Sequence, residues 1–376
     1  MKKSLVALAA LAATASFAQS TVTISGNWDA GVVNTSTQTY GGDGFGAAIN
    51  GSSTSNLAIS GTEDLGGGLS AGFKGVHLLN TASGQTGNGA TPYQTSNFFN
   101  DEIWVGIDKA GVGGIKIGAP NAGLFETNGK SQPFGTAFGG GYTSSGVNRL
   151  LGGTTTLGVN QYVGGGSANG RVVRAEKSIR LDTAVFNGFS ANYVYAPGND
   201  RSSTVTSNTN EFTNTTVNYS NGPLNVAYSA AQAKAGDSYV ASGAATGVTG
   251  NNSALNTGAS VKYTFLAANY TFGPATFYYG KTSGKTNAFT GGDKEVSSVN
   301  YAVKYALNGN VDLLANTLKV TDKVGTADQS LTGLSAIYKL SKRTSTYATL
   351  LRQDTNTSDN NAGRSNSTYV GIRHQF

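Results

Sequence analysis

The sequence has little of what usually stabilises or anchors a protein of its length. Its 376 residues include no cysteine, only six prolines and two histidines, and charged residues make up 12%, about half the share found in soluble domains. Without cysteine, disulfide bridges and thiol chemistry are excluded. Apart from a short run near the N-terminus, no stretch approaches the roughly 18 consecutive apolar residues of a membrane-spanning helix. A helical membrane protein and a disulfide-stabilised domain are both excluded.

The N-terminal residues are typical of a segment that is removed from the mature protein. Lys2 and Lys3 precede the apolar run Leu5 to Ala13, and Ser16-Phe17-Ala18 resembles an A-x-A cleavage site. This order is typical of a secretory signal peptide. We therefore expect a signal peptide at residues 1–18 and a mature chain at residues 19–376. A membrane anchor is the alternative.

The chain ends on a segment whose side chains alternate in character. Between Asn366 and Phe376, the apolar residues Val370 and Ile372 share a parity with Phe376, whereas Arg373 has the opposite parity. Successive side chains of a β-strand point to opposite faces. A strand with one apolar and one polar face suits the wall of a barrel in a lipid bilayer, with lipid outside and water inside.

The same alternation recurs along the chain between two kinds of connection. Seven short turns bearing Gly or Asn alternate with eight longer polar loops, which separates sixteen strands. Short turns at one rim and long loops at the other are typical of an outer-membrane barrel. The predicted fold is all-β, a sixteen-stranded antiparallel transmembrane barrel that holds an aqueous channel; a secreted β-rich adhesin is the alternative. The predicted turns are 63–68, 110–114, 186–189, 220–225, 272–276, 307–311 and 340–344, and the predicted loops are 34–52, 80–98, 121–170, 197–208, 236–256, 282–294, 322–328 and 354–365.

Several segments also resemble a known family. They include TVTISGNWDAGV at residues 21–32, GTEDLGGGLSAGFK at 61–74, SIRLDTAVFNGFSANYVYA at 178–196 and YVGIRHQF at 369–376. Together they resemble the general porins of Gram-negative β-proteobacteria, the group that includes trimeric anion-selective porins. The resemblance implies an outer-membrane location and a homotrimer in contact with outer-membrane lipid. It implies passive diffusion of ions and small hydrophilic solutes, with no cofactor and no enzymatic activity.

The third long loop is expected to carry the functional site. By resemblance, this loop folds into the barrel and narrows it, and here it falls within Asn121 to Gly170. Pro133-Phe134-Gly135 resembles the loop-tip motif of general porins, and Gly129 and Gly135 allow the chain to bend inward. Glu126 and Lys130 are the charged residues of its first half. An ordinary external loop is the alternative.

Charged residues of the barrel wall are expected to face this loop. In the segment 171–181, interpreted as one strand, Arg174, Glu176, Ser178 and Arg180 share a face. The resemblance implies that wall arginines set anion selectivity. Asn56, however, stands where the family has an arginine, so we expect a weak anion preference. Candidates for additional positive charge in the lumen are Lys74, Arg373 and Arg352. Other positions that are usually basic in the family are occupied here by Asp101, Glu102 and the segment 118–120. The predicted pore constriction comprises Asn56, Lys74, Glu126, Lys130, Arg174, Glu176 and Arg180.

Few residues point to other chemistry. Asp101 and Glu102 are adjacent, and in a strand their side chains would point to opposite faces, so we expect no acid–base pair there. His77 and His374 have no cysteine and no nearby histidine partner, so a metal site is not expected. The basic residues are scattered, which disfavours nucleic acid as a partner. An outer-membrane phospholipase stays open as an alternative, although no Ser/His/Asp arrangement is legible.

Overall fold

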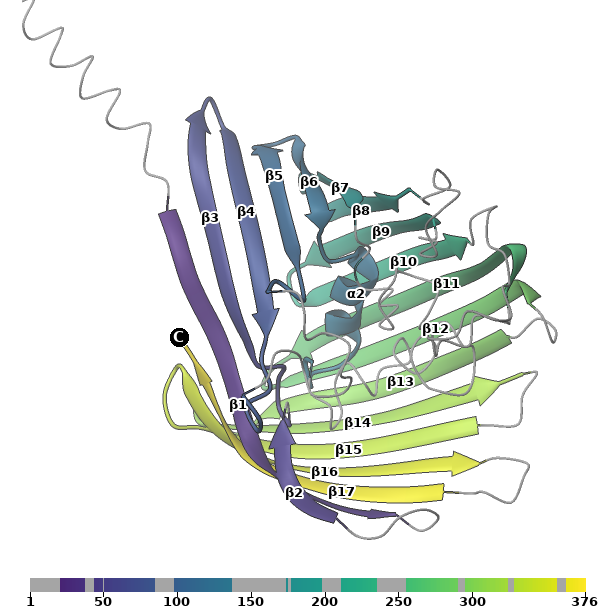
Figure 1. Ribbon diagram of the computed structural model, residues 1–376. Coiled ribbons are helices and arrows are strands. Elements are labelled where there is room, and N and C mark those ends of the chain that lie inside the picture. The colour runs from purple at the N-terminus through teal and green to yellow at the C-terminus, as the bar shows by residue number, and fades with distance from the viewer. Residues whose placement is uncertain are drawn as a thin grey trace, which may run out of the picture.

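The computed structural model of the chain is built almost entirely from β-strands (Figure 1). It describes residues 21–37, 44–49, 51–84, 98–136, 174, 177–197, 211–234, 255–289, 295–323, 328–356 and 363–376. The predicted signal peptide, residues 1–18, lies outside the described residues. The elements are β1 (Thr21–Thr37), β2 (Gly44–Ile49), β3 (Asn56–Gly66), β4 (Leu69–Leu78), β5 (Ile103–Lys109), β6 (Gly113–Ala119), α2 (Gly123–Ser131), β7 (Ser178–Thr183), β8 (Phe189–Ala196), β9 (Glu211–Asn221), β10 (Leu224–Lys234), β11 (Leu255–Phe272), β12 (Ala275–Phe289), β13 (Glu295–Ala306), β14 (Val311–Asp322), β15 (Asp328–Lys339), β16 (Thr344–Asn356) and β17 (Gly363–Gln375).

The strands close into an antiparallel barrel of sixteen positions. β1 pairs with β17 along one edge, from Asn27↔Gln375 to Thr37↔Ser365. Along its other edge, β1 pairs with β3 in its first half and with β2 in its second half. β2 and β3 are therefore two halves of one interrupted strand, and the described strands form sixteen positions around the barrel. The predicted sixteen-stranded fold is confirmed.

The two faces of the strands have opposite character, as the alternation predicted. On β1, Val22 and Ile24 are 66% and 63% exposed, whereas Asn27 and Asp29 are 7% and 0% exposed. On β17, Val370 and Ile372 are exposed in the same way. Apolar side chains therefore form the outer surface that lipid covers, and most of the polar set faces the interior.

The predicted turns are confirmed, whereas the predicted loops 34–52 and 282–294 are partly wrong; β12 continues to Phe289, inside the second of them. All seven turns join consecutive strands of the described chain, from β3–β4 to β15–β16. The predicted loop 34–52, however, contains the end of β1 and the whole of β2. The β2 sequence GFGAAI contains two glycines and does not alternate between polar and apolar residues. Its strand conformation therefore depends on pairing with Ala30 to Thr35 of β1.

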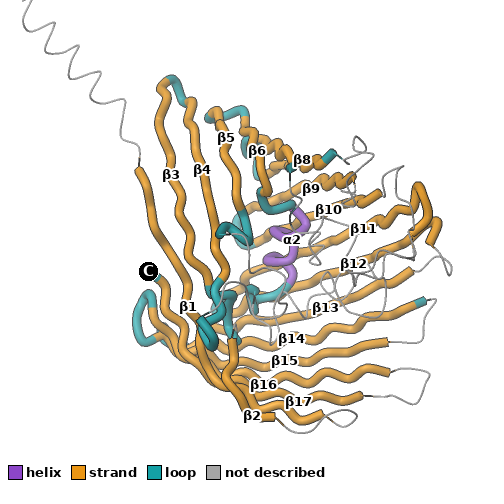
Figure 2. The backbone as a smooth tube through the Cα atoms, viewed as in Figure 1, coloured by secondary structure: helices purple, strands orange, loops and turns teal. Residues whose placement is uncertain are grey.

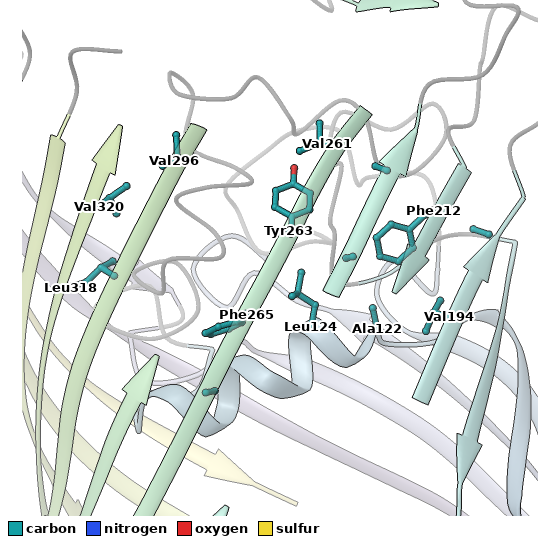
Figure 3. Close-up of a cluster of buried hydrophobic side chains, with 14 of the residues drawn as sticks. Ala122, Leu124, Val194, Phe212, Val261, Tyr263, Phe265, Val296, Leu318 and Val320 are labelled. Carbon is teal, nitrogen blue, oxygen red and sulfur yellow. The ribbon is translucent and has the colours of Figure 1, made fainter. Parts of the chain in front are cut away.

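Part of the inner wall is apolar as well, which no sequence pattern predicted. Buried residues of β8 to β15 form one cluster together with Ala122 and Leu124 (Figure 3). Val261, Tyr263 and Phe265 of β11 are at most 1% exposed, while Leu266 on the other face of this strand is 38% exposed. Because both faces of β11 carry apolar residues, its sequence alternates only weakly.

The C-terminus completes the closure. Gly26 and Phe376 exchange backbone hydrogen bonds of 3.1 and 3.2 Å. The Phe376 ring lies over Gly26, where an added Cβ would come within 2.3 Å of it, and it meets the Trp28 ring edge-on at 5.9 Å. The terminal aromatic residue therefore covers a glycine on the outer surface, next to the seam between β1 and β17.

Candidate pore constriction

Helix α2 lies inside the barrel, against the inner face of β8 to β13 (Figures 1 and 2). Leu124 N donates to Asn214 Oδ1 at 3.1 Å. A Cβ added at Gly123 would lie 2.2 Å from Thr216 Oγ1, so only glycine allows this close approach. The first part of the third loop is thus directed inward, as predicted, while residues 137–173 lie outside the described residues.

Arg180 of β7 ties α2 to the wall. Its Nη1 donates to Glu126 Oε1 and to Asn121 O, both at 2.6 Å. Its Nε and Nη2 donate to Asp182 Oδ1 at 2.8 and 2.6 Å. Lys116 Nζ reaches the other oxygen of Asp182 at 3.0 Å. Glu126 and Arg180, both among the predicted constriction residues, are therefore brought together, and Asp182 and Lys116, which the prediction missed, complete the group. Asp182 lies two residues after Arg180 in β7, so both side chains point to the same face of the strand. This spacing could have identified Asp182 from the sequence.

A second group of charges surrounds Asn121. Arg174 forms an ion pair with Asp101, and its Nε donates to Asn121 Oδ1 at 2.5 Å. Asn121 Nδ2 in turn donates to Glu102 Oε2 at 3.1 Å, and Lys74 Nζ donates to the same oxygen at 2.7 Å. Asp101 and Glu102 thus each neutralise a separate cation, and they do not converge as an acid–base pair.

The predicted strand 171–181 does not fit the described residues Arg174 and Lys177. β7 begins only at Ser178, and Lys177 has a φ of +55°, a left-handed conformation that interrupts a strand. Arg174 instead forms an isolated bridge with Asn121 and lies 5.5 Å from the centre of the Phe125 ring. The shared-face argument therefore holds for Ser178 and Arg180 but not for Arg174, and Glu176 lies outside the described residues.

The tip of the inward segment reaches the opposite part of the wall. Gly135 has a φ of +59°, which permits the turn after Pro133-Phe134. Thr136 Oγ1 then accepts a hydrogen bond of 2.9 Å from Thr54 N. Gly129, which was expected to allow a bend, lies within α2 instead. The inward segment therefore extends from its anchor on Arg180 of β7 to its contact with Thr54, beside β3.

Residues 51–55, between β2 and β3, form what we call the inner bulge. Asp29 holds it: its carboxylate accepts hydrogen bonds from the backbone N–H groups of residues 51, 52 and 53 at 3.2, 2.9 and 2.8 Å. Tyr347 OH donates to the same carboxylate at 2.6 Å. Sequence reasoning missed this element, because its partners are 22 to 318 residues away from Asp29.

Asn56 lies at the start of β3, next to the inner bulge. It is directly opposite Asn27 in the register of β1 and β3, so both side chains share the inner face. Arg373 Nε donates to Asn27 Oδ1 at 2.5 Å, which places a positive charge beside Asn56. Arg352 was a candidate for the lumen, but it is exposed on the outer face and bonds Asp354 at 2.9 Å.

The accessible charges of the lumen differ from those that the resemblance implied. The side chains of Arg180 and Arg174 are only 7% and 11% accessible within their ion pairs, whereas Lys74 and Glu126 are 37% and 38% accessible. Lys130 Nζ donates to Asn218 Oδ1 at 2.5 Å. Partial burial lowers the pKa of the Lys130 ammonium from 10.5, an effect that the nearby Glu126 opposes. Ions in the lumen would therefore meet lysines and Glu126 before they meet the arginines.

These features define a class of protein: a sixteen-stranded transmembrane barrel narrowed by an internal segment with paired charges. Within the part of the chain that the structure describes, no three His, Asp or Glu side chains group as a metal site. A model of the Gram-negative porin family matches residues 5–358. The chain belongs to this family and is therefore a protein of the bacterial outer membrane.

Individual relatives support this assignment. The chain is 31% identical to outer membrane porin protein 32 of Delftia acidovorans over 236 residues, which is 62% of this chain and 60% of the relative. It is 26% identical to an outer membrane porin protein of Bordetella pertussis over 252 residues, 61% of this chain and 59% of the relative. The matched region thus spans about three fifths of either relative.

Solved structures share the fold. An anion-selective porin from Comamonas acidovorans superimposes with a TM-score of 0.73 at 23% identity, covering 95% of this chain and all of that chain. OmpT of Vibrio cholerae, in a trimer form, superimposes with a TM-score of 0.63 at 12% identity, covering 95% of this chain and 99% of that one. At these identities the similarity extends to the fold alone.

Proposed function

We propose that the chain forms a water-filled channel through which ions and small hydrophilic solutes diffuse passively. The observation that carries this proposal is the position of α2, held against one side of a sixteen-stranded barrel by Arg180 and Asn214. A barrel of this size encloses an aqueous channel, and an element fixed to the wall narrows such a channel. The family and fold favour a channel over an enzyme.

Liposome swelling tests this proposal. Vesicles that contain the refolded protein should swell in isotonic sugar solutions, at rates that fall as the sugar grows from a pentose to a trisaccharide. Protein-free vesicles and vesicles with heat-denatured protein serve as controls. A folded barrel that gives no faster swelling than these controls would contradict a diffusion channel.

Within this function, we propose a weak anion preference set at the predicted constriction. The support is the pairing of charges: Arg174 with Asp101, Arg180 with Glu126 and Asp182, and Lys74 with Glu102. Opposite charges within a few ångströms cancel each other's field at the distance of a passing ion. Lys130 leaves a small positive excess, whereas Arg373 faces the carboxylate of Asp29 in the register of β1 and β17.

The assembly and the processing are also part of this proposal. A homotrimer in the outer membrane is supported by the family resemblance, and multi-angle light scattering of the detergent-solubilised protein would measure it. The proposed signal peptide, residues 1–18, leaves a mature chain that begins at Gln19, and the intact mass of the protein from outer membranes tests this. A mass that includes residues 1–18 would contradict cleavage at Ala18.

A further inference from the structure

Trp104 of β5 is an aromatic residue on the inner face of the barrel. It lies between Ile103 and Val105, which are 41% and 61% exposed on the outer face, so its own side chain points to the lumen. The side chain is partly exposed. Its Nε1 donates to Glu102 Oε1 at 2.9 Å, which fixes the indole beside the group of charges around Asn121. A large flat side chain is thus held on the channel wall next to the constriction.

Glycines lie beside the indole on the same face of the wall. Gly118 is the register partner of Trp104 on β6. Gly106 is the next inward residue of β5, and its partner on β4 is Gly72. A Cβ added at Gly72 would lie 3.7 Å from the ring, in ordinary contact with it. Because glycine has no side chain, the indole lies next to bare backbone at these positions, which leaves space for a solute beside the ring.

Two lysines flank the indole and supply hydrogen-bond donors. Lys74 is the register partner of Trp104 on β4, and Lys116 Nζ lies 5.2 Å from the centre of the ring. Their side chains are 37% and 31% accessible, so solutes in the lumen can reach them. Each ammonium group carries three donors, and one of these binds a carboxylate, Glu102 for Lys74 and Asp182 for Lys116. The remaining donors can bind oxygens of a solute that lies on the ring.

The charges around the indole are balanced, and this balance indicates the kind of solute. Three cations and three carboxylates form the ion pairs of this part of the wall: Lys74, Lys116, Arg180, Glu102, Asp182 and Glu126. A site without net charge attracts an anion only weakly. Hydroxyl groups, in contrast, accept from ammonium groups without needing a net charge. A neutral solute with several hydroxyl groups and one flat apolar face therefore fits the wall here.

We propose that Trp104 is a stacking subsite for pyranose sugars on the turn side of the constriction. The inference rests on the proposed channel function and adds the class of solute that the wall contacts. The C–H groups on one face of a pyranose ring form a flat apolar patch that matches the indole, while Lys74 and Lys116 donate to its hydroxyl oxygens. β5 runs from this point to the short turn before β6, and the short turns of such barrels face the periplasm. A weak contact of this kind guides a sugar out of the constriction without trapping it.

Tryptophan fluorescence tests this inference, because the chain contains only two tryptophans. Trp28 is 54% exposed on the outer face, and in Trp28→Phe all tryptophan emission comes from Trp104. Titration of this detergent-solubilised variant with maltotriose should change the emission until it saturates. Sorbitol is the matched control, since it carries the hydroxyl groups of a hexose but has no ring. It should give no saturable change.

Interruptions of the open-channel current give a second measurement. Maltotriose added to a conducting channel in a planar bilayer should interrupt the current, and the interruptions should be about fivefold shorter in Trp104→Ala, which loses the aromatic contact. Trp104→Phe keeps a smaller ring and should stay within about threefold of the unmodified protein. Trp28→Phe is the control and should leave the interruptions unchanged. If Trp104→Ala does not fold, the fluorescence titration decides, because it leaves Trp104 in place.

Three results would overturn the inference. Equal responses to maltotriose and sorbitol would show that the ring face is not recognised. Interruptions of equal length in Trp104→Ala and Trp28→Phe would show that the sugar is held elsewhere. Tighter binding of benzoate than of maltotriose would assign the indole to aromatic anions. A channel that conducts but shows no sugar effect contradicts this inference alone, whereas a folded barrel without conductance contradicts the channel function itself.

Discussion

At the scale of single residues, the structure separates charges that hold the protein together from charges that ions can meet. Arg174 and Arg180 are the residues that a porin-like sequence suggests for selectivity, yet their side chains are only 11% and 7% accessible. A buried ion pair contributes little field to its surroundings, and loss of one partner is costly. The lysines of the lumen, which are more accessible, should therefore have the larger effect on selectivity.

Lys130→Gln should reduce the anion preference by about twofold at neutral pH, because one of the few uncompensated positive charges is lost. The pH dependence provides a second readout. Burial lowers the pKa of Lys130, so the unmodified residue is charged below this lowered pKa and neutral above it. Anion preference should accordingly fall as the pH rises through values below 10.5.

Reversal potentials measured at a series of pH values check this prediction. Lys130→Arg is the matched control, since it keeps the positive charge throughout the same range. The fall in anion preference at alkaline pH should be absent in both variants. If it persists unchanged in Lys130→Gln, another group is responsible for it.

At the scale of elements, α2 and the inner bulge are both fixed by contacts between distant parts of the chain. The sequence predicted an inward segment with Glu126 and Lys130, but it did not predict the helix. Asn128 and Gly129 have low helix propensity, and the helix is stabilised by the wall residues Arg180 and Asn214. Such contacts cannot be read from local patterns, because they depend on which strands stand opposite the loop.

Arg180→Gln should loosen α2 from the wall. The change leaves Glu126 and Asp182 without their shared cation, and breaking a buried pair of this kind costs about 3 kcal/mol. Open-channel current noise should rise, and the folded barrel should convert to the unfolded form at a lower temperature. Lys116→Gln removes the same charge and also contacts Asp182, but it does not touch Glu126, so it should leave the noise unchanged. Equal noise in both variants would show that Arg180 does not hold the helix.

Asp29→Asn should release the inner bulge. An amide oxygen cannot accept all four hydrogen bonds that the carboxylate receives, and each unsatisfied buried donor costs about 1–3 kcal/mol. Hydrogen–deuterium exchange at residues 51–55 should accelerate tenfold or more. Tyr347→Phe removes one of these bonds and should give a smaller increase. Unchanged protection in Asp29→Asn would mean that the bulge is held by its other contacts, such as those of Thr54 with Thr136 and of Ser55 with the backbone of Asp29.

At the scale of the whole molecule, the barrel follows from simple features of the sequence. The alternation of Val22 and Ile24 with Asn27 and Asp29, repeated between turns, was enough to predict the fold and the strand number, because a lipid-exposed face tolerates few polar residues. The interruption between β2 and β3 was not predictable, because Asp29 stabilises it from another strand. The apolar inner wall around Phe265 was not predictable either, since period-two alternation disappears when both faces are apolar.

Deletion of Phe376 should impair closure of the barrel. The residue makes two backbone hydrogen bonds to Gly26, and its ring covers this glycine and contacts Trp28. The yield of heat-modifiable, folded barrel on electrophoresis should fall severalfold, because the seam loses about 1 kcal/mol per hydrogen bond together with the burial of an aromatic ring. Phe277→Ser, which truncates an outward aromatic residue on β12, is the control and should lower the yield less. Equal yields would show that closure does not depend on the terminal residue.

The central claim is that a barrel narrowed by an anchored helix conducts ions with nearly balanced fixed charge. Single-channel recording in a planar bilayer under a KCl gradient tests it most directly, because one experiment gives both conductance and selectivity. We expect steady conductance steps and a reversal potential displaced slightly toward the chloride equilibrium potential. A folded barrel that never conducts, or a reversal potential close to the potassium equilibrium potential, would contradict the claim.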